Sequence, residues 1–140
     1  MRSPIERSFM AVKFQSDEYF EAANEAMKSS EAVLKEAKGR NVVIQIVTTD
    51  YPGIGEKKTF LKIVDGQPSA GPGEIDDPDS TIRQNYETAV ALDKGEISPQ
   101  TAFMEGKIKI KGNLMKMMQL QRFMQTLGPA AKHIEREYEI

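Results

Sequence analysis

The side chains that carry most protein chemistry are scarce in this chain. It has no cysteine and a single histidine, His133. A thiol nucleophile, a disulfide and a thiolate-bound metal are therefore excluded, as is a metal site built from several histidines. His133 lies between Lys132 and Ile134 in a polar stretch, which favours an exposed helical residue over a general base. We expect no catalytic group at this position.

Two short segments resemble ligand-binding loops but lack residues that such loops need. The segment 53–57 reads GIGEK, without the spacing of a P-loop or the third glycine of a dinucleotide fingerprint. Asp76, Asp77 and Asp79 resemble a calcium loop, but the sixth position holds no glycine. We therefore expect a binding protein rather than an enzyme, with no cofactor and no metal.

Length and charge limit the class of protein further. The chain has 140 residues, which fits one domain with a real core, and 19 basic against 21 acidic residues. A nearly neutral balance argues against a nucleic-acid partner. No apolar run approaches the roughly 20 residues of a membrane-spanning helix, and no signal peptide is visible, so we expect a cytoplasmic protein.

The most informative feature is the segment 113–127, which is more apolar than a surface helix needs to be. One interpretation is an ordinary core helix. The other is a helix that packs on a sheet with one side and faces a second apolar space with another, which would be a ligand cavity, a partner protein or a membrane. Methionine side chains adapt to guests of different shape, which suits a promiscuous pocket. The large apolar residues of the segment are Leu114, Met115, Met117, Met118, Leu120, Phe123, Met124 and Leu127.

Hydrophobic periodicity and turn residues predict the elements around this segment. The order of the elements predicts an α+β domain with a mainly antiparallel sheet. Residues 1–12 are expected to be a flexible extension, and a short strand near 67–70 is allowed within an otherwise loop-like stretch, 67–79. The predicted helices span 17–38, 87–94 and 114–127, the last ended by Gly128-Pro129, and the predicted strands span 42–49, 59–64, 80–85 and 107–111.

Charge is distributed unevenly along the chain. Lysines alternate at 107, 109 and 111, which is typical of the solvated face of an edge strand. Residues 94–122 hold six basic and two acidic residues, whereas 65–79 hold five acidic residues and no basic one. Besides the solvated-face interpretation, this distribution allows a transient contact with an anionic membrane surface.

The segment 95–113 resembles the signature of the SCP-2 (sterol carrier protein 2) family. It reads GEISPQTAFMEGKIKIKGN, and the family pattern is G-x-[LI]-[NS]-P-Q-x-A-[FM]-x-x-G-K-[LI]-x-[IV]-x-G-[ND]. Residues 14–24 resemble the start of the family's first helix, and 114–127 its apolar helix. The resemblance covers residues 13–127, and the tail 128–140, which has no clear counterpart, is expected to cover or open the ligand site.

This resemblance implies a sheet of about five strands, helices on one side of it, and a hydrophobic tunnel that holds a lipid without covalent chemistry. The implied ligand is a fatty acid, an acyl-CoA, a phospholipid or a sterol-like molecule. The alternative is an interaction or regulatory module that docks a partner through 114–127. Gln100 is expected to contact the ligand or to hold its turn, and Met118 and Met124 are the wall residues that we single out. The expected ligand-binding residues are Gln100, Phe103, Met104, Ile108, Ile110, Leu114, Met117, Met118, Leu120, Phe123 and Met124.

Overall fold

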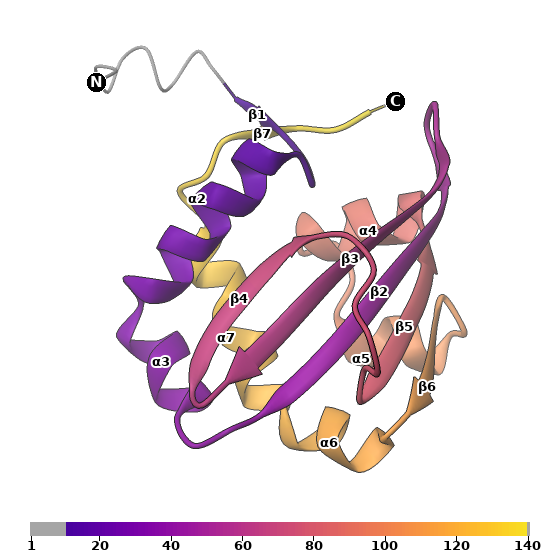
Figure 1. The fold of residues 1–140 in the computed structure, drawn as a ribbon. Helices are drawn as coiled ribbons and strands as arrows, with labels where there is room; N and C mark the ends of the chain where they lie inside the picture. Colours follow the sequence, from indigo (N-terminus) through magenta and orange to yellow (C-terminus); the bar gives the residue numbers. More distant parts are fainter. Residues whose placement is uncertain (1–10, 140) are drawn as a thin grey trace.

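A computed structural model describes residues 11–139, which form a curved sheet with helices gathered on one side of it (Figure 1). Within these residues the main sheet has five strands in the order β4-β3-β2-β5-β6. Only β2 and β5 run parallel; the other neighbours are antiparallel. The predicted α+β class and mainly antiparallel sheet are confirmed. The strands are β2 (Val42–Tyr51), β3 (Gly55–Val64), β4 (Gln67–Pro72), β5 (Ser80–Asn85) and β6 (Ile108–Gly112).

Six helices lie within the described residues, and α4, α5 and α7 lie behind the sheet in Figure 1. Two short strands, β1 (Val12–Lys13) and β7 (Arg136–Glu137), pair in parallel beside the main sheet. None of the helices in residues 11–139 is long and apolar enough to cross a membrane. The extension expected at 1–12 lies mostly outside the described residues. The helices are α2 (Asp17–Lys28), α3 (Glu31–Ala37), α4 (Tyr86–Asp93), α5 (Pro99–Met104), α6 (Leu114–Gln119) and α7 (Gln121–Ala131).

The single helix predicted at 17–38 is wrong, because the chain breaks at Ser29 and Ser30. The Ser30 side chain accepts a hydrogen bond from the backbone N–H of Val33 at 3.2 Å and so starts α3. Serine competes well for backbone donors, which favours a helix start over a helix interior. Ser98 and Pro99 likewise start a helix. Ser98 caps α5, and Pro99 occupies its first turn, where the missing N–H costs nothing.

The helix predicted at 114–127 is in fact two helices, and its expected end at Gly128-Pro129 is wrong. Asn113 caps α6, accepting from the Lys116 N–H at 3.0 Å, and the chain changes direction at Leu120. Helix α7 then runs through Pro129 to Ala131. The proline lies in the last turn and has a φ that suits a helix, so it removes only one hydrogen bond.

The core lies between the sheet and the helices. Ile44 comes from the central strand β2 and Ile63 from its neighbour β3, and Val33 and Phe123 come from α3 and α7; all four are almost completely buried. Two residues expected to line a tunnel, Leu120 and Phe123, belong to this core cluster. The core therefore fixes α7 against the sheet and α3.

Candidate functional site

A cavity of about 810 Å³ lies between the helix-covered side of the sheet and helices α2, α4 and α7. Its volume is in the range of sites that enclose a small organic ligand. Most of its lining is apolar and comes from several elements, so it is a feature of the whole fold rather than of one helix. The main apolar lining residues are Phe20, Ala23, Ala26, Met27, Ile46, Leu61, Ile82, Ile108, Met124, Leu127, Ala130 and Ile134.

Strand register gives the cavity its apolar floor. Ile46 of β2 pairs with Ile82 of β5, and Ile82 pairs in turn with Ile110 of β6. Residues paired in this way point to the same side of a sheet, and residues two apart along a strand share a side. The β-branched side chains of β2, β5 and β6 therefore form one continuous surface beneath the helices.

Part of the cavity is lined by a polar cluster around Asp93, at the end of α4. Arg136 donates to both Asp93 carboxylate oxygens from Nη1, at 2.9 and 3.2 Å. The Tyr138 hydroxyl donates to Asp93 at 2.5 Å, and the Tyr19 hydroxyl donates at 3.4 Å. Burial, with the nearby Asp93 carboxylate, raises the pKa of Tyr19 and of Tyr138 far above the ordinary value. Both tyrosines therefore stay neutral donors.

The tail after α7 is held along this part of the cavity by backbone pairing as well. The Val12 N–H donates to the Glu135 carbonyl at 3.0 Å, and the Phe14 N–H donates to the Glu137 carbonyl at 2.9 Å. The Phe14 ring lies 5.3 Å from the ring of Tyr138. Segments from the two ends of the described chain thus form one wall of the cavity.

Gln15 is the unusual polar residue of the lining. It is buried, its φ of 64° lies in the left-handed region, and its Oε1 has no hydrogen-bond partner within residues 11–139. The backbone carbonyl of Gln15 accepts a hydrogen bond from Lys57 Nζ at 2.6 Å. Burial lowers the pKa of Lys57, and the negative charge of Asp17 offsets part of this effect by raising it. Gln15 is not among the residues expected from the sequence, because no pattern in the sequence marks it.

The structure divides the eleven expected ligand-binding residues into three groups. Ile108 and Met124 line the cavity. Leu120 and Phe123 are core residues, and Ile110 and Met117 pack against the core. The remaining five residues reach the protein surface outside the cavity lining. These surface residues are Gln100, Phe103, Met104, Leu114 and Met118, of which Met118 is 73% exposed. Of the segment 114–127, only the second half, in α7, contributes to the cavity lining.

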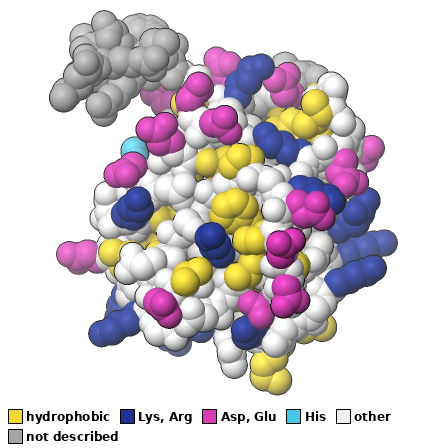
Figure 2. Space-filling model, in the orientation of Figure 1, with side chains coloured by type: hydrophobic (Ala, Val, Ile, Leu, Met, Phe, Trp, Pro, Cys, Tyr) yellow, Lys and Arg dark blue, Asp and Glu magenta, His cyan; other side chains and the backbone are white. Residues whose placement is uncertain are grey.

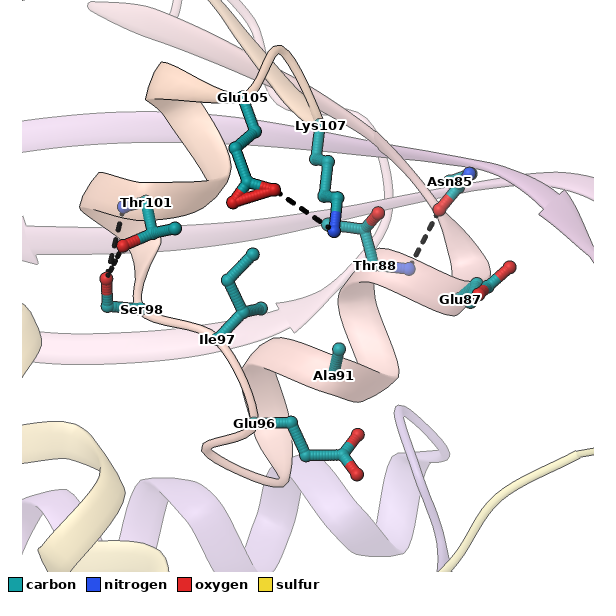
Figure 3. A pocket seen from close by; sticks show the side chains of 10 residues that line it. All are labelled: Asn85, Glu87, Thr88, Ala91, Glu96, Ile97, Ser98, Thr101, Glu105 and Lys107. Atoms are coloured by element: carbon teal, nitrogen blue, oxygen red, sulfur yellow. Dashed lines mark hydrogen bonds and ion pairs between the residues drawn. The ribbon is translucent and has the colours of Figure 1, made fainter.

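A second pocket, of about 660 Å³, lies between α4 and α5 and is mainly polar (Figure 3). The Ser98 and Asn85 side chains accept hydrogen bonds that start α5 and α4. Lys107 pairs with Glu105 at 3.5 Å. No group of three potential metal ligands occurs in residues 11–139. These polar side chains thus hold local structure, and the apolar cavity is the better candidate site.

Comparison with known proteins agrees with this geometry. The model of the SCP-2 sterol transfer family matches residues 20–125. The chain is 36% identical over 81 residues to sterol carrier protein 2 of Bos taurus, covering 58% of this chain and 15% of that protein. It is 29% identical over 119 residues to non-specific lipid-transfer protein-like 1 of Caenorhabditis elegans, covering 79% of this chain and 91% of that protein.

Among solved structures, a crystal structure of sterol carrier protein 2 superimposes with a TM-score of 0.72 at 20% identity. The match covers 87% of this chain and 99% of the other. At this identity the likeness concerns the fold alone.

Proposed function

Because the chain belongs to the SCP-2 sterol transfer family, we propose that it binds a lipid non-covalently in the cavity of about 810 Å³. The observation that carries this proposal is the apolar lining that the sheet, α2 and α7 supply together. The chain spans only 15% of the bovine relative, and for this reason the function rests on the cavity rather than on that protein's name.

Burial of apolar surface provides the binding energy in this proposal. Each methylene group moved from water into the cavity contributes about 0.8 kcal/mol, so a long acyl chain needs few polar contacts. Such a site selects by length and shape more than by functional groups. The ligand class is accordingly a fatty acid, a fatty acyl-CoA, a phospholipid or a sterol-like molecule.

The polar end of the ligand is expected in the part of the cavity lined by Gln15, Lys94 and Lys132. An amide offers both donors and an acceptor, whichever way round it lies, and Gln15 Oε1 has no partner within the described chain. The Asp93 carboxylate is already taken by Arg136 and Tyr138. Gln15 and the two lysines are therefore our candidates to meet a hydroxyl or an anionic head group.

Native mass spectrometry of the purified protein tests the proposal. The expected spectrum shows the chain with an added mass that organic extraction removes and that mass analysis of the extract identifies as lipid. A chain that stays empty after incubation with palmitate and with a phospholipid would contradict lipid binding. An empty chain that instead appears with a second protein would favour the interaction module considered from the sequence.

A further inference from the structure

Helix α6 leaves three large apolar side chains in water. Leu114 is 47% exposed, Met115 68% and Met118 73%, and no residue of α6 is buried. Hydrophobic side chains reach the surface at the lower edge of Figure 2, where Figure 1 places α6. Large exposed apolar side chains gathered on one short element mark a contact surface more often than a structural need.

The three side chains form one stripe. At about 100° per residue, positions 114, 115 and 118 fall within an arc of about 100° on the helix. Met117 lies on another side of α6 and packs against the core. The stripe is therefore the side of α6 that the protein itself leaves uncovered.

Basic side chains lie on the two elements next to α6 in the chain, β6 before it and α7 after it. Lys109 and Lys111 are exposed, lie two residues apart on the edge strand β6, and so point to the same side of it. Lys107 and Lys116 have acidic partners, Glu105 and Asp79, whereas no ion pair within residues 11–139 involves Lys109, Lys111 or Arg122. Lys and Arg side chains gather on the right of Figure 2, the side on which Figure 1 places β6.

We propose that this α6 surface, formed by Leu114, Met115 and Met118 with Lys109, Lys111 and Arg122, docks on an anionic lipid bilayer. The apolar stripe enters the boundary between head groups and acyl chains, and the basic side chains meet the negative surface. A second copy of the chain is a poor occupant, because two such surfaces would bring positive charges face to face. This inference goes beyond lipid binding in the cavity and does not depend on it.

Position is the second reason for choosing a flat bilayer rather than a groove in a protein. The α6 surface lies at the edge of the sheet, and α6 is held firmly from behind. The Asn113 N–H donates to the Asp79 carbonyl at 2.9 Å, and Lys116 Nζ lies 3.0 Å from the Asp79 carboxylate. A Cβ at Gly112 would collide with the same Asp79 carbonyl, so the start of α6 lies tightly against β5. The stripe is therefore presented rigidly, as docking on a surface requires.

Sedimentation with vesicles tests the proposal. The wild-type chain is expected to bind vesicles of phosphatidylcholine with phosphatidylserine, to bind pure phosphatidylcholine at least tenfold more weakly, and to be released by salt. The variants Met115→Gln/Met118→Gln and Lys109→Gln/Lys111→Gln should each bind the anionic vesicles at least tenfold more weakly. Circular dichroism checks that each variant is folded.

Two control variants make the same kinds of change, apolar to Gln and Lys to Gln, elsewhere on the surface. Ile54→Gln removes an exposed apolar side chain at the β2–β3 turn, and Lys28→Gln/Lys35→Gln removes two exposed lysines from α2 and α3. Both should bind like the wild type. Wild-type-like binding by the α6 variants, with loss in the α2/α3 variant, would overturn the proposal in favour of the other surface. Absence of wild-type binding to anionic vesicles would also overturn it.

The lipid content of the same variants separates this proposal from the previous one. Native mass spectrometry should find the α6 variants loaded with lipid as the wild type is. Loss of vesicle binding with bound lipid retained supports docking through α6. Loss of both vesicle binding and bound lipid would refute the proposal that the α6 side chains act only in docking.

Discussion

Arg136 and Asp93 join the tail of the chain to the end of α4, with Arg136 Nη1 2.9 and 3.2 Å from the two carboxylate oxygens. The side chains are only 12% and 13% exposed. Charges this far from water are tolerated when their hydrogen bonds are complete, and here two backbone carbonyls and two tyrosine hydroxyls supply the rest. The pair therefore fastens the tail over part of the cavity.

Replacing Arg136 with methionine should release the tail. The change leaves Asp93 nearly buried without its cation, which costs about 3 kcal/mol of unfolding free energy. Urea unfolding measures this loss, and hydrogen exchange should become faster over residues 132–139. The double variant Asp93→Asn/Arg136→Met removes both charges and should recover part of the loss. Tail exchange as slow as in the wild type would contradict this role.

Replacing Gln15 with glycine should separate stability from binding. Glycine adopts the positive φ of this position freely, so the free energy of unfolding should rise by about 1 kcal/mol. Lipid affinity should fall, because the amide expected to meet the ligand is gone. Asp65→Gly is the matched control: its φ of 50° is also positive, and Asp65 does not line the cavity. Equal lipid affinity for the two variants would show that the Gln15 side chain does not contact the ligand.

Acid should erase the contribution of Asp79 to stability. The Lys116 hydrogen bond and then the Val43 N–H, 2.8 Å from Asp79 Oδ2, lower the pKa of this carboxyl below its usual 3.8. The folded state therefore binds the proton less tightly than the unfolded state does, and the stabilisation is complete above the usual pKa and is lost as the pH falls through the lowered one. The unfolding free energies of the wild type and Asp79→Asn should differ at pH 7 and converge as the pH falls below the lowered pKa of Asp79. A difference that is constant with pH would exclude this ion pair as its source.

Local signals predicted the elements whose ends are set by neighbouring residues. Ser16 and Asn113 cap α2 and α6, and both are residue types that favour a helix start. The breaks at Ser30 and Leu120 were not predicted, because apolar periodicity continues across both and tertiary packing decides the direction of the chain there. The parallel pairing of β2 with β5 joins residues 36 apart, from Ile44 and Ser80 onward, and no local pattern encodes it.

The candidate site was predicted only where the family signature and the apolar helix meet the cavity, at Ile108 and Met124. The break at Leu120 separates the orientation of α6 from that of α7, so Met118 faces water although it shares a sequence pattern with Met124. Gln15 and Arg136 reach the cavity through the pairing of β1 with β7, a contact between residues more than 100 positions apart. Only the folded chain brings these residues together.

Titration with a fluorescent fatty acid is the most direct test of a lipid site in this cavity. Met124→Gln places an amide in the apolar lining and should weaken binding at least about tenfold. Met104→Gln makes the same chemical change at a side chain that is 80% exposed and outside the lining, and should leave affinity unchanged. Affinities are compared at temperatures where denaturant melts show both variants fully folded. Selective loss in Met124→Gln is the predicted result, and equal affinity of Met124→Gln and the wild type would contradict the account.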